Sequence, residues 1–297
     1  MRNERLCGLG TALVTPFTET GAVDYDALAR LIDRQATGGA DYLVVLGTTG
    51  EAVTMTADEQ REVTEFVVNR NAGRLPLVAG VGGNCTAAVV QRLVSHRSRL
   101  QDQFDAILSV CPYYNKPSQE GLYRHFSAIA EASPVPVILY NVPGRTGVNM
   151  LPETAVRIHK SHPDKVAGVK EASGDMAQIG RLTDLSQTET GGELLVISGD
   201  DGLAAAVMQR GGAGLISVAS NAYPAAFRRI VHEQDSDLQA EYEPFVRLLF
   251  KEGNPAGIKT ALCQMGLIQN VLRLPLVPNS CEVQRELSEC MKRLPER

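Results

Sequence analysis

Eight short apolar runs, each separated from the next by about 20 to 35 residues, most constrain the fold of this chain. Every interval between them contains a helical pattern, and alternating β and α units indicate a parallel sheet. Eight such units predict an α/β protein with a closed (β/α)8 TIM barrel. A doubly wound open sheet is the alternative, because alternation alone does not prove closure. The runs begin near Gly10, Tyr42, Leu77, Asp105, Val135, Val166, Leu194 and Gly214.

Helix-start signals support these units. Asp24 is placed to cap a helix that ends at Gly38-Gly39, and Thr56 with Glu59 forms a possible capping box. Further helix starts are predicted at Ser118, Pro152 and Pro224. After about Tyr223 only helical patterns follow. The sequence therefore predicts a barrel catalytic domain over residues 1–224 and a C-terminal helical domain over residues 225–297.

Composition narrows the class of protein. A formal charge of −5 without a basic patch argues against a nucleic-acid partner, and no stretch is long enough to span a bilayer. The N-terminal residues lack the pattern of a signal peptide. The six cysteines form no Cys-x-x-Cys pair and have no histidine at zinc-finger spacing. We expect reduced thiols in a cytoplasmic protein without membrane or nucleic-acid partners.

Lys170 is the most informative single residue. It closes the apolar run Val166–Val169 and is followed by Glu171-Ala172. Of the seven lysines it alone ends a strand-like run, and the other six are interpreted as surface or helix-end charges. A solvated charge at a strand end is the ordinary interpretation. The alternative is an amine nucleophile held on a rigid strand.

Polar side chains at the other strand ends favour the nucleophile. An amine that attacks a ketone must be neutral, and burial beside apolar residues penalises the ammonium form. Tyr140 ends the preceding run and is placed to donate and recover the proton that imine formation requires, although a strand-end tyrosine can also serve packing alone. Thr48 and Thr49 lie in a glycine-flanked turn whose amides suit a small carboxylate, although a plain turn is equally consistent. Arg145 follows a Pro-Gly bend and is either a carboxylate clamp or a surface charge.

Several cofactor signatures are missing from the sequence. The clusters Gly80–Gly83 and Gly211–Gly214 fit neither a Walker A nor a dinucleotide pattern and are interpreted as turns. The pair His159 and His162 lies at an apparent helix end, where a metal site is not expected. An imine-forming aldolase therefore fits better than a metal-dependent one.

These residues resemble the dihydrodipicolinate synthase and N-acetylneuraminate lyase family. The likeness extends from the first strand through the last and weakens in the helical tail. The matching motifs are Gly47-Thr48-Thr49-Gly50-Glu51, Pro112-Tyr113-Tyr114-Asn115, Tyr140-Asn141-Val142-Pro143, Arg145-Thr146-Gly147, Lys170-Glu171-Ala172 and Ser198-Gly199-Asp200-Asp201.

The resemblance implies a role for each matched residue. Lys170 would form an imine with pyruvate, and Tyr140 with Thr48 and Tyr114 would form a proton relay. Tyr114 would come from the neighbouring subunit. Four further residues would bind the substrates. Thr49 would bind the pyruvate carboxylate, Arg145 would bind the carboxylate of aspartate semialdehyde, and Gly199 and Ile216 would line the pyruvate site. No metal or organic cofactor is implied.

The resemblance also implies a reaction and an assembly. Pyruvate would condense with L-aspartate-4-semialdehyde in the diaminopimelate route of lysine biosynthesis, and the enzyme would be a homotetramer built from tight dimers. Arg145 favours the synthase, because the lyase branch does not normally carry arginine in this motif. Two alternatives stay open: a pyruvate-dependent sugar-acid aldolase, and a non-catalytic barrel that only binds a keto acid.

The family's lysine-inhibited members share an effector pocket at the tight dimer interface, and this chain departs from that pattern. Asn84 and Tyr113 match the pocket. Four other positions do not match it, and they are Ala52, Ala57, Gln60 and Ala88. They stand where inhibited members tend to carry serine, two histidines and a glutamate. Without that carboxylate the effector's ammonium would be poorly paired, so we expect weak or absent lysine feedback.

Overall fold

Eight parallel strands form a closed barrel in chain order, β1 to β8, in a computed structural model that describes residues 3–294. The barrel prediction is confirmed, and the open sheet is excluded. The strands are β1 Gly8–Ala12, β2 Tyr42–Val45, β3 Leu77–Gly80, β4 Ala106–Val110, β5 Val137–Asn141, β6 Val166–Glu171, β7 Leu195–Ser198 and β8 Gly214–Ser217.

Helices follow the strands as the sequence predicts. The α-helices are α1 Tyr25–Gly38, α2 Ala57–Asn71, α3 Thr86–Ser95, α4 Arg97–Gln103, α5 Gln119–Ala132, α6 Pro143–Thr146, α7 Pro152–Ser161, α8 Met176–Thr190, α9 Ala204–Gln209, α10 Pro224–His232, α11 Ser236–Phe250, α12 Ala256–Gln264 and α13 Cys281–Met291. Short 3-10 helices are η1 Glu4–Leu6, η2 Thr48–Gly50, η3 Ala52–Thr54, η4 Asp201–Leu203 and η5 Ala219–Asn221.

The predicted starts of the elements agree closely with the structure. Strand β5 begins at Val137 rather than Val135 because Pro136 has no N–H to donate to a neighbouring strand. Asp24 accepts a hydrogen bond from the Ala27 N–H at 2.9 Å and caps α1. Thr56 and Glu59 form the predicted capping box of α2, with bonds of 2.9 and 3.2 Å. The predicted helix starts at Ser118, Pro152 and Pro224 are also confirmed.

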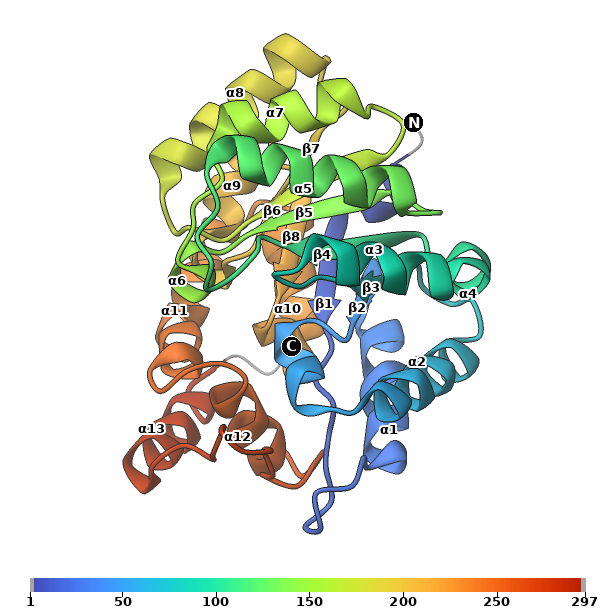
Figure 1. Ribbon diagram of the computed structural model, residues 1–297. Helices are drawn as coiled ribbons and strands as arrows, with labels where there is room; N and C mark the ends of the chain where they lie inside the picture. Colours follow the sequence, from blue (N-terminus) through green and yellow to red (C-terminus); the bar gives the residue numbers. More distant parts are fainter. Residues whose placement is uncertain (1–2, 295–297) are drawn as a thin grey trace. The chain divides into compact units, whose positions relative to one another are not determined.

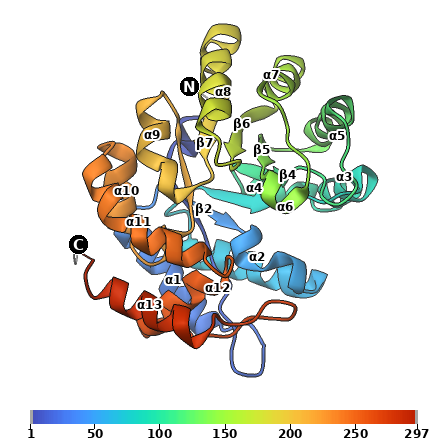
Figure 2. The ribbon, with the colours of Figure 1, turned by 90° about the vertical axis from the view of Figure 1, so that its left-hand side faces the viewer.

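The chain divides into two compact units, which are described separately. Unit 1 comprises residues 1–7 and 76–216, and therefore carries β3 to β7 and most of β8. Figure 2 shows α3, α5, α7 and α8 in an arc outside its strands β4 to β7. The strands of this unit are almost entirely buried, which is typical of parallel strands that are covered on both faces.

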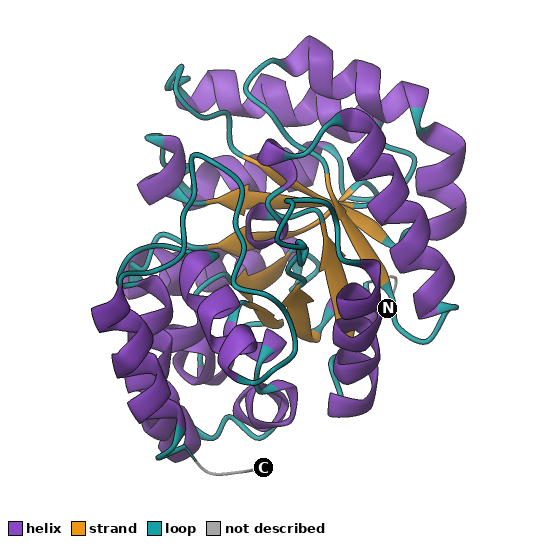
Figure 3. Ribbon diagram, turned by 90° about the horizontal axis from the view of Figure 1, so that it is seen from below, coloured by secondary structure: helices purple, strands orange, loops and turns teal. Residues whose placement is uncertain are grey.

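Unit 2 comprises residues 8–75 and 217–297. It holds β1, β2, α1 and α2 together with the C-terminal helices, of which α12 and α13 lie side by side in Figure 1. Its core includes Phe227 of α10 and Tyr242 and Phe245 of α11, all fully buried. In both units the helices lie outside the strands (Figure 3). The domain boundary between residues 224 and 225 stays a prediction.

Two further sequence expectations concern cysteines and membranes. All six cysteines are free thiols, and Cys111 and Cys290 are buried. Burial raises the pKa of the Cys111 thiol, and nearby Glu171 adds to this effect. Over residues 3–294, none of the helices has both the length and the apolar character needed to cross a bilayer.

Candidate active site

Lys170 and Tyr140 lie side by side at the C-terminal ends of two adjacent strands of unit 1. Strands β5 and β6 pair in parallel, and the register places Tyr140 directly opposite Lys170. The Lys170 Nζ lies 4.3 Å from the centroid of the Tyr140 ring. Both side chains are buried, with 6% and 7% of their surfaces exposed. The strand pairing alone therefore places a buried amine against a phenol.

The backbone at Gly199 leaves the space that the Lys170 side chain occupies. A Cβ atom at this position would lie 3.0 Å from the Lys170 Cε and 2.6 Å from the Ala172 Cβ. The Gly199 N–H donates to the Glu171 carbonyl at 2.8 Å, which fixes this approach. Strand β7 ends at Ser198, which pairs with Leu215 of β8. Gly199 and the buried Ile216 are the next residues along these two segments.

A second polar pair, Asn141 and Glu171, directly follows the first pair along both strands. The register pairs the two residues, and the alternation of side chains along a strand turns them to the face opposite Tyr140 and Lys170. The Asn141 amide donates to the two Glu171 carboxylate oxygens at 3.1 and 2.9 Å. Gln178 of α8 donates to the same carboxylate at 3.1 Å, and the Ser173 N–H donates at 2.8 Å. This buried network holds the strand ends in register.

The segment that carries Arg145 is connected to this network. Arg145 lies in α6 and is exposed. A little further along, Asn149 accepts a hydrogen bond from the Asn141 amide at 2.8 Å, and the Met150 N–H donates to the Asn141 oxygen at 2.9 Å. Asn141 therefore connects the ends of β5 and β6 to the end of the segment that carries Arg145.

Tyr114 is exposed, as is Arg145 among the predicted site residues of unit 1. Its side chain is 88% exposed, and its backbone adopts a positive φ of 76°. The Tyr114 N–H donates to the Thr146 carbonyl at 3.2 Å, which holds the backbone beside α6. The hydroxyl therefore lies on the surface of the chain, where the resemblance requires it to be if it serves a neighbouring subunit.

Thr48 and Thr49 lie in unit 2, in the short helix η2 after strand β2. Thr49 is buried, whereas Thr48 is exposed. The Asn254 Nδ2 donates to the Thr49 Oγ1 at 3.0 Å, and the Thr15 hydroxyl donates to the Gly50 carbonyl at 2.8 Å. The turn is thus held by the segment that follows β1 and by the C-terminal segment of its unit. The relay between Thr48 and Tyr140 stays a prediction.

A profile of the Dihydrodipicolinate synthetase family matches residues 5–294. The chain belongs to this family. A relative from Parabacteroides distasonis, named 4-hydroxy-tetrahydrodipicolinate synthase, is 46% identical over 99% of both chains. A monomeric dihydrodipicolinate synthase variant has a TM-score of 0.91 and 39% identity, covering 97% of this chain and 96% of its own. The chloride-inhibited enzyme from Acinetobacter baumannii, complexed with pyruvate, has a TM-score of 0.90 and 38% identity, covering 97% and 98%.

The sequence-based prediction for Lys259 is wrong. Lys259 is not a surface or helix-end charge, because its side chain is fully buried and forms an ion pair with Glu51, which is buried as well. Burial lowers the pKa of Lys259 to about 8, and the Glu51 carboxylate opposes this shift. The local sequence contained a signal of this burial, because Lys259 interrupts a run of small and apolar residues in α12. All residues of that run are buried.

Glu171 and Asn254 were also not assigned a role from the sequence. Glu171 is the last residue of strand β6, and its side chain is buried. The position of Glu171 directly after Lys170 was a signal that a second polar pair continues the strands. Asn254 precedes α12 by two residues, and nothing in its local sequence indicates a contact with Thr49.

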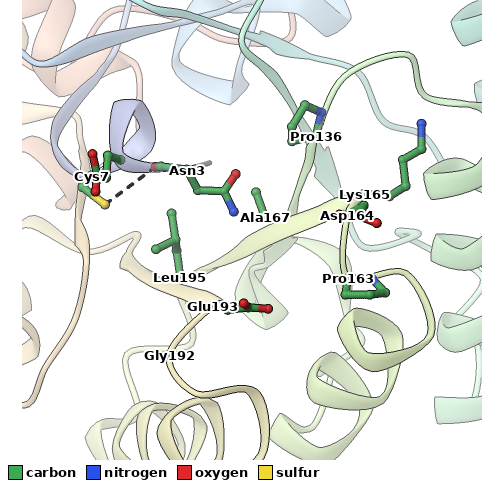
Figure 4. Close-up of a pocket in the computed structure, with 11 residues that line it drawn as sticks. Asn3, Cys7, Pro136, Pro163, Asp164, Lys165, Ala167, Gly192, Glu193 and Leu195 are labelled. Atoms are coloured by element: carbon green, nitrogen blue, oxygen red, sulfur yellow. Dashed lines mark hydrogen bonds between the residues drawn. The ribbon is translucent and has the colours of Figure 1, made fainter. Parts of the chain in front are cut away.

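Other features of unit 1 lie away from these residues. A hollow of about 860 Å³ is lined by Pro136, Lys165, Leu195 and neighbours around the N-terminal ends of β5 to β7 (Figure 4). In barrels of this kind that end contributes stability, whereas catalysis occurs at the other end. No group of three or more His, Cys, Asp or Glu side chains suited to a metal ion occurs within residues 3–294.

Proposed function

We propose that the chain is a lyase that condenses pyruvate with L-aspartate-4-semialdehyde to give 4-hydroxy-tetrahydrodipicolinate. The observation that carries the proposal is the buried Lys170 amine beside Tyr140, in a chain that is 46% identical to a named 4-hydroxy-tetrahydrodipicolinate synthase. This reaction belongs to the diaminopimelate route of lysine biosynthesis. Free thiols and a biosynthetic role are consistent with a cytoplasmic enzyme.

Lys170 begins the proposed mechanism. Its neutral amine attacks the ketone carbon of pyruvate, and the resulting carbinolamine loses water to give an imine. Tyr140 would donate the proton that the departing hydroxyl needs to leave as water, and Thr48 with Tyr114 would resupply a proton to Tyr140 from solvent. The low exposure of Lys170 excludes competing water from the imine.

Carbon–carbon bond formation follows on the imine. Loss of a proton from the methyl group gives an enamine, whose terminal carbon attacks the aldehyde of aspartate semialdehyde. The amino group of this substrate then attacks the imine carbon, closes the ring and releases Lys170 unchanged. Thr49 would bind the pyruvate carboxylate, and Arg145 would bind the carboxylate of the second substrate as a bidentate partner. Gly199 and Ile216 would line the pyruvate site.

Reductive trapping tests the imine. The protein is incubated with pyruvate and borohydride, and the adduct is located by peptide mapping with mass spectrometry. We expect one adduct on Lys170 and complete loss of activity. Lys259 is an internal control, because it is also buried but is paired with Glu51. No adduct on folded protein, under conditions that trap a known pyruvate aldolase, would defeat the proposal and favour a keto-acid-binding barrel.

The aldehyde partner is tested separately. Turnover is compared with aspartate semialdehyde and with sugar-derived aldehydes, and we expect a preference for the first of at least about 100-fold in kcat/KM. A preference for a sugar aldehyde would establish the lyase alternative instead. No contact in the described residues favours that alternative.

Weak lysine feedback is a further expectation of this proposal. Gln60 donates its amide to the Ala52 carbonyl at 2.8 Å and to the Met55 carbonyl at 3.3 Å, so this side chain is bound to its own loop. Ala88 supplies no carboxylate for an effector's ammonium. We expect roughly 80% or more of the activity to remain at about 1 mM lysine. Half-inhibition at micromolar lysine would contradict this expectation, and Ala88→Glu tests whether the missing carboxylate is the cause.

A further inference from the structure

A buried ion pair in unit 2 has no part in the chemistry described above. Lys259 of α12 pairs with Glu51, and neither side chain is exposed to solvent. Glu51 directly follows the Thr48–Gly50 turn, and its backbone adopts a left-handed φ of 53°. The desolvation of two buried charges offsets much of their attraction, so stability alone does not account for such a pair. Its position beside the turn indicates a geometric role.

Glu51 is held by both of its carboxylate oxygens. Oε1 contacts the Lys259 ammonium, and Oε2 accepts a hydrogen bond from the Arg273 backbone N–H at 3.2 Å. The Arg273 guanidinium in turn binds both Glu59 oxygens, at 2.6 and 2.8 Å. This contact lowers the pKa of Glu59 to about 2, so its carboxylate is charged at neutral pH. The direction of the Glu51 side chain is therefore fixed by two segments of the C-terminal part.

The aromatic ring of Phe17 lies against both cations. The Lys259 Nζ is 4.1 Å from the ring centroid, and the Arg273 Cζ is 4.3 Å from it. Lys259 also donates to the Val271 carbonyl at 3.0 Å. The carboxylate, the carbonyl and the π face around the amine favour its charged form, whereas burial and the nearby Arg273 cation oppose it. At neutral pH Lys259 carries its proton, since its pKa is about 8.

Asn254, which lies just before α12, acts on the turn itself. Its Nδ2 donates to the Thr49 Oγ1, so this bond uses an acceptor site of the hydroxyl and leaves its hydrogen available to donate. A hydroxyl with an available hydrogen suits a carboxylate ligand. Helix α12 and its start therefore set both the backbone after the turn, through Glu51, and the polarity of the Thr49 hydroxyl.

We propose that Lys259, Glu51 and Asn254 are positioning residues that hold the Thr48–Thr49 turn in the geometry that receives the keto-acid carboxylate. The C-terminal helical segment would thus determine the affinity for pyruvate without touching it. This inference rests on the proposed function, because it assigns the turn to pyruvate. It predicts a change in pyruvate KM with little change in kcat.

The test is the double variant Glu51→Gln/Lys259→Met, which removes both charges and leaves no lone buried ion. We expect pyruvate KM to rise about tenfold, with kcat within about threefold and the aldehyde KM unchanged. The melting temperature, followed by circular dichroism, should stay within about 5 °C of the wild type. The matched control is Lys251→Met/Glu286→Gln, which makes the same change at an exposed pair of the same unit, 2.7 Å apart.

Each outcome decides the proposal. A folded double variant with the pyruvate KM of the wild type overturns it, because a purely structural pair would be replaced without kinetic effect. If the double variant does not fold, Asn254→Asp decides, since this near-isosteric change replaces the donor to Thr49 with an acceptor. We expect a similar rise in pyruvate KM, and an unchanged KM overturns the inference.

Trapping of Lys170 separates this inference from the proposed function. If neither the wild type nor the control forms a pyruvate adduct, the proposed function fails. If the wild type, the control and the double variant all form the adduct with equal half-saturating pyruvate, only the positioning role fails.

Discussion

At the scale of single residues, the site depends on where side chains are small as much as on where they are reactive. Lys170 is a long side chain with its amine against Tyr140, and it reaches that position across Gly199. Close packing keeps the buried amine in one orientation, and correct orientation of reacting groups is a large part of catalysis.

Gly199→Ala tests this use of space. The new methyl group would lie 2.6 Å from the Ala172 Cβ and 3.0 Å from the Lys170 Cε, so the backbone around Ala172 must shift and the lysine must give way slightly. We expect kcat/KM to fall roughly 100-fold, with slower borohydride trapping of pyruvate and an unchanged far-UV spectrum. Gly144→Ala is the matched control, because a Cβ there would have no neighbour within 4 Å. Equal activity of the two variants would show that Lys170 does not need this space.

At the scale of elements, most of the barrel could be predicted because its signals are local. A capping side chain such as Asp24 or Thr56 contacts an N–H only three residues away, and an apolar run reports its own burial. Lys170 and Tyr140 could be paired in advance because parallel strands place their C-terminal ends at the same edge. These predictions needed no knowledge of distant contacts.

The parts that could not be predicted depend on contacts between distant segments. Lys259 meets Glu51 and Asn254 meets Thr49 across about 200 residues of chain, and nothing in the local sequence states such a contact. The Asn141 amide and the Glu171 carboxylate likewise meet across 30 residues of chain. Sequence motifs indicate the residues that we propose bind substrates. The residues that we propose position those binding residues can be recognised only from the tertiary structure.

At the scale of the whole molecule, the exposure of Tyr114 bears on how many chains form one active site. Tyr114 is 88% exposed, while Lys170 and Tyr140 are buried. We propose that Tyr114 completes the relay of a neighbouring subunit in a homotetramer built from tight dimers. One structural relative is a monomeric variant, so membership of the family does not by itself set the assembly.

A complementation experiment tests this proposal directly. Tyr114→Phe and Lys170→Ala should each lose most turnover while keeping the fold, because each removes one part of the chemistry. If Tyr114 acts across the interface, a mixed dimer has one site with both wild-type groups. Co-expression of the two variants at equal levels should then restore about a quarter of the wild-type activity, since about half of the dimers are mixed and one of their two sites is complete.

The neighbouring residue supplies the control. Tyr113→Phe removes the same hydroxyl one position away, from a side chain that is 39% exposed, and it should keep near wild-type turnover. Equal, low activity of the mixture and of the separate variants would place Tyr114 in its own subunit's site. Unchanged turnover of Tyr114→Phe alone would remove Tyr114 from the relay. Restored activity that disappears on dilution would show that the tight dimer, rather than the single chain, is the smallest complete catalyst.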